Sequence, residues 1–251
     1  MIKVREVEAK SILNKSKIFD YCVNPYTGCQ VGCAYCYAKL FIPRYSGHGE
    51  PWGTFVDVKT NAPDLLRKQL RRARRGTVWL SSVCDPYQPL EAKYLLTRRC
   101  LEALAECGFP VQVQSKSVLL LRDIEILARI RDLEVGFTIA TDDERTARLF
   151  EPFASTPLER AQALGALRSR GIRTFAFIGP LLPLNPGKLA ELLDGAVDRV
   201  LIDRMNYMET FRPFLVRHGF SDVLSEDYFR RTAAGLASLF RSRGVETEIL
   251  F

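Results

Sequence analysis

The sequence contains no run of about 18 apolar residues, the length that a helix needs to cross a membrane. Its first ten residues, MIKVREVEAK, are charged where a secretory leader would need an apolar core. We therefore expect a cytoplasmic protein with no membrane partner. Such a reducing compartment would keep cysteines as thiols.

A complete disulfide framework is also missing, because the chain has seven cysteines, an odd number. A chain of 251 residues, 47% hydrophobic and 26% charged, can bury an adequate core without disulfide bonds. A single α/β barrel domain can contain this many residues. We therefore predict a single domain over residues 1–251.

Three cysteines stand close together in the segment NPYTGCQVGCAYCY, residues 24–37. The spacing of Cys29, Cys33 and Cys36 is CxxxCxxC, which suits three irons of a [4Fe–4S] cube and leaves the fourth iron without a protein ligand. Ordinary electron-transfer cubes take four thiolates. The trio therefore predicts a cluster whose open corner binds another molecule.

A structural zinc site is the alternative interpretation of this trio. Cys22 or His48 could complete a tetrahedron with the three thiols. Zinc motifs usually show two separated CxxC-like pairs, and the sequence has no second pair. The zinc interpretation implies a non-enzymatic nucleic-acid-binding domain, whereas the cluster interpretation implies an enzyme.

Apolar runs alternate with helical patterns along the chain, which predicts βα units and a parallel sheet. The expected strands are residues 78–80, 111–114, 135–139, 174–178, 200–202 and 248–251. With a cluster loop at residues 25–37, this pattern predicts an α/β fold of the partial TIM-type (β/α)6 barrel kind from about residue 18 to 251.

Ligands of parallel βα folds bind at the carboxyl ends of the strands. The strand at 78–80 leads into Ser82, Cys84 and Asp85, and prolines at 86 and 89 show that this segment is a loop. The Asp85 side chain could alternatively cap a turn. Lys116 follows the strand at 111–114 in an apolar neighbourhood, so its ammonium group needs a partner. Thr138 ends a third strand, and its hydroxyl could simply bond backbone.

These motifs resemble the radical S-adenosylmethionine (SAM) superfamily, and within it the branch that includes spore photoproduct lyase. The resemblance rests on the CxxxCxxC trio with Tyr35 before the last cysteine, and it extends over about residues 18–183. The supporting segments are residues 24–29, 36–38, 81–91, 116–117 and 150–152. It implies one radical SAM domain with a [4Fe–4S] cluster and SAM as cofactors.

The resemblance also implies roles for individual residues. Cys29, Cys33 and Cys36 would hold the cluster, and Tyr35 would lie near the adenine of SAM. Lys116 would bind the methionine carboxylate, and Thr138 the ribose or methionine portion. The Gly-Gly-Glu motif that binds the methionine amine in many relatives is absent, and its expected substitutes are Ser82, Cys84 and Asp85.

By the same resemblance, one electron from a flavodoxin-type or ferredoxin-type donor would cleave SAM to methionine and a 5′-deoxyadenosyl radical that abstracts hydrogen. Cys84 is a candidate hydrogen donor or cofactor contact. If Asp85 is matched to the aspartate of the lyase, however, the position of the donor falls on Ser82. Tyr37 and Tyr87 are candidate radical relays or base-stacking surfaces.

The substrate is suggested only by charge. The net charge is +7, and a helix expected at residues 65–75 carries six cations in nine positions, a natural partner for a nucleic acid backbone. A solvated helix face is the alternative, because no aromatic residue interleaves these cations. A small metabolite or a peptide is the other possible substrate.

The glycine-containing loop at residues 45–53 could close over the opening of the barrel that the sequence predicts.

Overall fold

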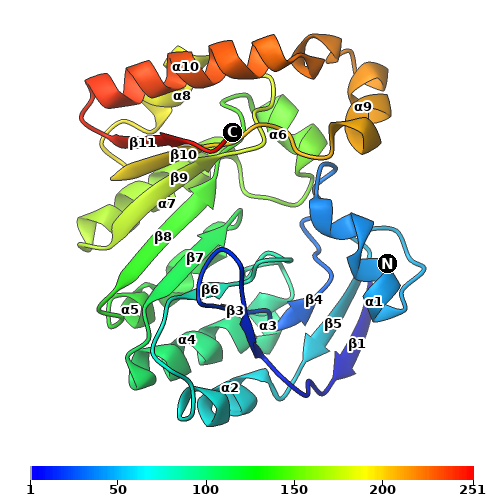
Figure 1. Ribbon diagram of the computed structural model, residues 1–251, viewed down its shortest axis with the longest axis vertical. Coiled ribbons are helices and arrows are strands. Elements are labelled where there is room, and N and C mark those ends of the chain that lie inside the picture. Colours follow the sequence, from blue (N-terminus) through cyan, green and yellow to red (C-terminus); the bar gives the residue numbers. More distant parts are fainter. Residues whose placement is uncertain (1) are drawn as a thin grey trace.

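A sheet of eight strands forms the centre of the part of the chain that the structure describes, residues 2–251. Figure 1 shows this computed structural model. The strand order is β11-β10-β9-β8-β7-β6-β3-β2. The bounds are β2 Leu13–Lys15, β3 Tyr21–Val23, β6 Val78–Leu80, β7 Val111–Ser115, β8 Leu133–Thr138, β9 Arg173–Ile178, β10 Arg199–Ile202 and β11 Glu246–Ile249.

Neighbouring strands of this sheet run parallel from β3 to β11, and only β2 pairs antiparallel with its neighbour within residues 2–251. Helices connect the parallel strands and lie along the outer side of the sheet (Figure 1). The α/β class and the parallel sheet expected from the sequence are confirmed. All six expected strands exist, although β11 begins at Glu246 and ends at Ile249.

The α-helices lie between strands along the chain. They are α1 Ile42–Ser46, α2 Ala62–Leu70, α3 Glu91–Tyr94, α4 Leu96–Cys107, α5 Ile124–Leu127, α6 Glu144–Phe150, α7 Pro157–Ser169, α8 Pro186–Leu192, α9 Met208–Arg217 and α10 Glu226–Ser242. Short 3₁₀ turns lie at η1 Tyr37–Leu40, η2 Val118–Asp123 and η3 Ser221–Leu224. Within residues 2–251, no helix has both the length and the apolar composition to cross a membrane.

Strand β7 illustrates how the sheet separates core from cavity. Its side chains alternate between two faces, as in any strand. Val111 and Val113 are buried in the main hydrophobic core, whereas Gln112 and Gln114 line a cavity on the opposite face. The inner face of the sheet is therefore partly polar, and the helices cover the apolar outer face.

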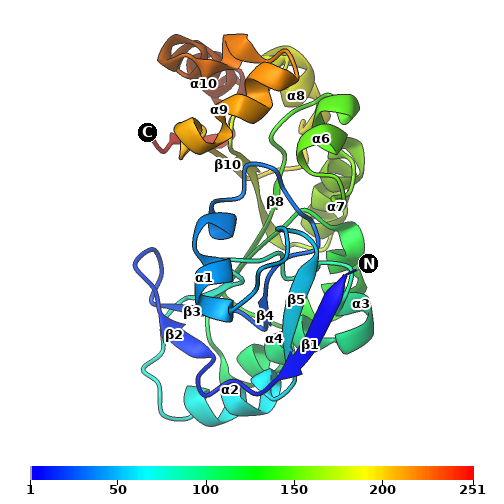
Figure 2. The same cartoon turned by 90° about the vertical axis from the view of Figure 1, so that its right-hand side faces the viewer.

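A second, three-stranded sheet was not expected from the sequence. Strand β1 (Lys3–Val7) pairs parallel with β5 (Phe55–Lys59), and β4 (Tyr26–Thr27) pairs antiparallel with β5. The cluster loop leaves directly from β4. Figure 2 shows this sheet beside α1, on the same side of the molecule as the loop. The charged stretch at the start of the chain is thus an edge strand that supports the loop.

The basic segment differs from its prediction. Helix α2 ends at Leu70, so Arg71, Arg72, Arg74 and Arg75 lie beyond it and do not form a stripe on one helix. Helix α2 packs against α4, and the arginines lead into the amino end of β6. The predicted helix is therefore confirmed over residues 65–70, and its last five residues were wrong, because arginines are good helix formers and do not mark where a helix ends.

Candidate active site

A cavity of about 620 Å³ opens at the carboxyl ends of the parallel strands. Ten of the site residues predicted from the sequence line it. They are Cys29, Cys33, Cys36, Tyr35, Tyr37, Ser82, Cys84, Asp85, Lys116 and Thr138. The structure thus brings these side chains together from the cluster loop and from the ends of β6, β7 and β8.

The cluster loop is held against the small sheet by a close backbone contact. Gly28 has φ +88°, and a Cβ atom there would lie 2.4 Å from the carbonyl oxygen of Phe55. Only glycine allows both this left-handed conformation and this approach. The following cysteines, Cys29 and Cys33, are buried with Val31 in a small apolar cluster.

The chemistry of the three thiols fits a metal cluster that is bound by deprotonated sulfur. Burial raises the pKa of Cys29, Cys33 and Cys36, so the metal-free side chains carry protons that a metal would displace. The backbone N–H of Asp85 donates a hydrogen bond to Cys29 Sγ at 3.3 Å. Within residues 2–251, no three His, Cys, Asp or Glu side chains are grouped to hold one metal ion.

Neither residue proposed as the fourth ligand of a tetrahedral zinc ion, His48 or Cys22, is placed to bind a metal together with the three thiols. His48 Nδ1 lies 2.9 Å from Glu50 Oε2, and His48 Nε2 lies 2.9 Å from Asp57 Oδ1. Both ring nitrogens are therefore occupied in the small sheet, where the ring also stacks on Phe55. Cys22 lies within β3 and, like His48, does not line the cavity.

Asp85 joins the loop after β6 to the end of β7. Its Oδ1 accepts hydrogen bonds from the Tyr87 backbone N–H at 2.8 Å and from Ser115 Oγ at 2.7 Å. Its Oδ2 accepts the Lys116 backbone N–H at 2.7 Å. The carboxylate does cap a turn, as the alternative interpretation held, and it also fixes the position of Lys116.

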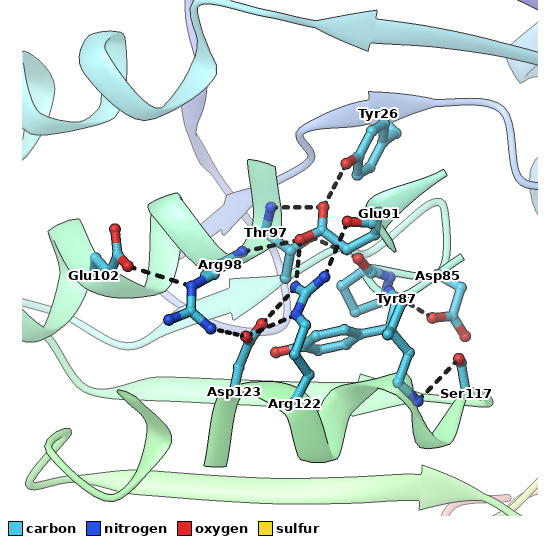
Figure 3. Close-up of polar contacts among 12 residues, drawn as sticks. Tyr26, Asp85, Tyr87, Glu91, Thr97, Arg98, Glu102, Ser117, Arg122 and Asp123 are labelled. Carbon is cyan, nitrogen blue, oxygen red and sulfur yellow. Dashed lines mark hydrogen bonds and ion pairs between the residues drawn. The ribbon is translucent and has the colours of Figure 1, made fainter. Parts of the chain in front are cut away.

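Behind Asp85, buried ion pairs anchor the same loop, as Figure 3 shows. Arg122 Nη2 lies 2.9 Å from Glu91 and 2.7 Å from Asp123, and both acids are fully buried. Arg98 makes a second pair with Asp123 at 2.7 Å. Tyr87 is buried here and does not line the cavity, so its expected role at the mouth was wrong.

Three cations line the cavity: Arg199 and Arg204 are paired with carboxylates, and Lys116 is the third. Its Nζ lies 3.3 Å from Thr138 Oγ1 and 5.8 Å from the ring centroid of Tyr35. Burial opposes its charge, but the acidic groups of Cys33, Glu151 and Asp85 outweigh burial and raise its pKa. Within residues 2–251, no carboxylate lies in ion-pair distance of Nζ. Lys116 therefore remains available for an anionic ligand.

Sequence reasoning missed a buried pair that supports Tyr35 and Thr138. Tyr35 donates a hydrogen bond to Glu151, and Glu151 Oε2 lies 2.7 Å from Arg160 Nη2. Arg160 Nη1 donates to the Thr138 carbonyl at 2.6 Å. The segment at 150–152 had marked Glu151. Nothing in the sequence distinguished Arg160 from the other arginines of the chain.

Ser81 is a second residue that sequence reasoning missed. It has φ +66°, an uncommon conformation for a residue with a side chain, at the point where β6 enters the loop. Only 5% of its surface is exposed, and its Oγ is buried without an oxygen or nitrogen partner for a hydrogen bond. The Oγ of neighbouring Ser82 instead accepts a hydrogen bond from Asn24 at 3.2 Å. The Ser81 hydroxyl interacts with the Cys84 thiol, a weak hydrogen-bonding partner, and lowers the pKa of that thiol.

The loop at residues 45–53 is exposed at Tyr45, Gly47 and Gly49 but held by His48, Trp52 and Gly53, and none of its residues lines the cavity. His48 is buried, and Trp52 contacts the apolar cluster around Cys29 and Cys33. A Cβ atom on Gly53 would lie 3.1 Å from the Cα of Gly32 in the cluster loop. This loop thus forms part of the wall behind the cysteines, and the expectation of a lid was wrong.

Aromatic rings line the cavity at both ends of the strands. Near the amino ends, Phe19 and Trp79 make an edge contact with ring centroids 5.7 Å apart. Beyond the carboxyl ends, Tyr37 and Tyr207 are 40% and 60% exposed. The Tyr37 hydroxyl donates to the Ser82 carbonyl at 2.5 Å. Burial raises the pKa of Cys84, which lines the cavity nearby, to about 12.

The comparisons with known proteins agree with this geometry. The family model described as Radical SAM superfamily matches residues 23–196. An uncharacterized protein of Methanocaldococcus jannaschii is 35% identical over 72% of this chain and 69% of its own length. An uncharacterized protein of Mycobacterium tuberculosis is 35% identical over 72% of this chain, and the match spans 57% of that protein.

A solved structure is also similar. Spore photoproduct lyase, as a mutant with bound AdoMet and dinucleoside spore photoproduct, superposes with a TM-score of 0.70 at 13% identity. The match covers 99% of this chain and 81% of the lyase. At this identity the likeness concerns the fold.

The buried Glu151–Arg160 pair leads to a stability prediction. Both side chains are about 1% exposed, so Arg160→Met leaves an uncompensated buried carboxylate. We expect the free energy of unfolding to fall by about 3–5 kcal/mol, measured by urea denaturation. The double variant Glu151→Gln/Arg160→Met should recover part of this loss.

The matched control is Arg148→Met. Arg148 pairs with Glu144 at the surface, where the side chains are 62% and 66% exposed. We expect its effect to stay below about 0.5 kcal/mol. An equal loss in the two single variants would show that burial of the Glu151–Arg160 pair has no special weight.

Proposed function

The chain belongs to the radical SAM superfamily, and from this premise we propose that Cys29, Cys33 and Cys36 hold a [4Fe–4S] cluster with one open iron. Members of this family are enzymes that use such a cluster together with SAM. The observation that carries the proposal is the position of the three buried thiols in one cavity with Lys116, whose ammonium group has no carboxylate partner among residues 2–251.

The cluster and SAM, when bound, supply a one-electron cleavage that yields methionine and a 5′-deoxyadenosyl radical for hydrogen abstraction. The chain's own residues position the reactants. Lys116 would bind the methionine carboxylate, and the buried Ser81 hydroxyl, whose partner is the weakly bonding Cys84 thiol, would bond another polar group of SAM. Tyr35, whose hydroxyl is held by Glu151, would contact the adenine. The apolar walls limit the access of water.

We also propose that the parallel sheet acts as an incomplete (β/α)6 barrel, and that residues 1–251 work as one radical SAM domain. The support is the unbroken parallel order of six strands from β3 to β10, in which the ends of β6, β7, β8, β9 and β10 contribute residues to one cavity. Loops at these ends carry the site residues, as in closed barrels.

For the substrate we propose a nucleic acid base. The support is the opening of the cavity at the carboxyl ends of the strands, where the rings of Tyr37 and Tyr207 offer stacking faces and the amide of Asn206 offers hydrogen bonds. The basic segment after α2 lies at the amino end of β6, away from the strand ends that carry the site. Arg67 and Arg75 also pair with Glu106 and Asp132. The contact with nucleic acid therefore belongs at the mouth, with a small metabolite or a peptide as the alternative substrate.

The first experiment is anaerobic reconstitution with iron and sulfide, reduction with dithionite in the presence of SAM, and detection of 5′-deoxyadenosine by mass spectrometry. We expect product and about four irons per wild-type chain. Cys33→Ala should lose both, because two thiolates cannot hold the cube. Cys107→Ala, at an exposed cysteine outside the cavity, is the control and should behave as wild type. Stoichiometric zinc with no product would refute the proposal.

Binding of SAM tests the two cavity residues. Lys116→Met and Ser81→Ala should each weaken SAM binding by about 1–3 kcal/mol without loss of iron, because each removes a buried polar contact. Lys93→Met, at an exposed lysine, and Ser169→Ala, at an exposed serine of α7, are the controls. Unchanged dissociation constants, measured by equilibrium dialysis, would remove Lys116 and Ser81 from the site.

Fluorescence anisotropy with a labelled single-stranded oligonucleotide tests the substrate class. Tyr207→Ala should weaken binding by about 1–3 kcal/mol, the usual contribution of one stacked base. Arg72→Glu, in the basic segment, should change binding little. The reverse result would move the contact to the basic segment. If the wild-type protein does not bind, the nucleic acid proposal fails and the smaller substrates remain.

A further inference from the structure

An exposed row of aromatic rings starts at the last cluster cysteine. Tyr37 follows Cys36 directly, and Phe41 and Tyr45 come four and eight residues later, along η1 and α1. The ring centroids are 5.7 Å apart between Tyr37 and Phe41, and 6.5 Å apart between Phe41 and Tyr45. Tyr45 is 85% exposed, the highest value among the exposed large hydrophobic residues of the described chain.

The surface around Tyr45 carries an excess of positive charge. Arg44 is exposed, and within residues 2–251 no carboxylate lies in ion-pair distance of it. Two of the nearby acids are paired, Glu50 with Lys3 and Asp57 with Arg5, and the third, Glu6, accepts a hydrogen bond from the Tyr94 hydroxyl, so Arg44 and Lys59 leave one positive charge in excess. An aromatic patch with unpaired cations attracts an acidic partner.

A groove of about 820 Å³ lies directly behind this surface. Tyr45, Arg5 and Lys59 line it, and Lys59 donates to the Asn24 carbonyl at 2.8 Å. Val83 lines both this groove and the cavity that contains the three cysteines. The groove and the cavity therefore share a wall. In Figure 2, α1 lies at the surface between β2 and β5.

Radical SAM enzymes need a reductant. We propose that the face formed by Arg44, Tyr45 and the adjoining groove, here called the α1 face, docks a small acidic protein that carries a flavin or an iron–sulfur centre. One electron passes from the reduced carrier to the cluster, the carrier is oxidised by one electron, and no atom is transferred. This inference rests on the proposed function, since it presumes a cluster at the three cysteines.

Two features favour a protein carrier over a nucleic acid at this face. The segment Tyr37–Ser46 is the stretch of surface that follows Cys36 in sequence, so a carrier seated here is close to the cluster loop. The face also lies on the other side of the Val83 wall from the cavity, where a substrate must enter. The two partners can then bind without competing.

The test uses the reconstituted full chain and a recombinant flavodoxin in its fully reduced form. Stopped-flow absorbance measures how fast the flavodoxin reduces the cluster, and dithionite serves as a small reductant that needs no docking surface. The variants are Arg44→Glu and Tyr45→Ser, and the control is Arg71→Glu, an exposed arginine beyond α2. Binding of oxidised flavodoxin is measured separately by calorimetry.

We expect Arg44→Glu and Tyr45→Ser each to slow reduction by flavodoxin about tenfold or more and to weaken its binding, while reduction by dithionite stays at the wild-type rate. The wild-type rate should fall as salt rises, and Arg44→Glu should reduce that salt dependence. Arg71→Glu should resemble the wild type in every measurement.

The docking proposal is overturned if flavodoxin reduces both variants as fast as the wild type, if Arg71→Glu causes the same loss, or if flavodoxin does not bind the wild-type chain. Loss of oligonucleotide binding in Tyr45→Ser with normal flavodoxin reduction would also overturn it and assign the face to nucleic acid. Absence of iron from the wild-type chain is a different result, because it refutes the proposed function itself.

Discussion

The carboxylate of Asp85 is the contact on which the candidate site depends most. It accepts three hydrogen bonds, one within the loop after β6 and two that join this loop to the end of β7, and the backbone of the same residue donates to Cys29. One residue therefore sets the distance between the thiols and Lys116. Buried carboxylates are unfavourable without such partners, so this arrangement tolerates little change.

Buried ion pairs hold Asp85 and the neighbouring site residues in place. Glu91, Arg122 and Asp123 anchor the far end of the loop that carries Asp85, while Glu151 and Arg160 support Tyr35 and Thr138. Each acid has an arginine partner in a water-poor environment. Such pairs add little to the net free energy of unfolding, but breaking one costs several kcal/mol, roughly 3–5, because a buried charge is left alone. They therefore mainly select one geometry.

The sequence was sufficient for the parts of the site that depend on local pattern. Strand ends after apolar runs located Asp85, Lys116 and Thr138, and the spacing of the cysteines located the loop. Contacts between distant segments could not be read in this way. Arg160 looks like a surface arginine of an amphipathic helix until the fold places Glu151 beside it, and β1 resembles a charged tail until β5 pairs with it. The end of α2 was missed because Arg71 and Arg72 are themselves good helix formers.

The sheet has two free edges, β2 and β11, within the part of the chain that the structure describes. Ile18 and Phe19 beside the first edge and Leu250 beside the second both line the cavity. The opening therefore runs along the side of the molecule and is wider than a funnel at the top of a closed barrel. A polymer can lie across this slot and present one unit at a time, so the size of the substrate is not limited by the volume of the cavity.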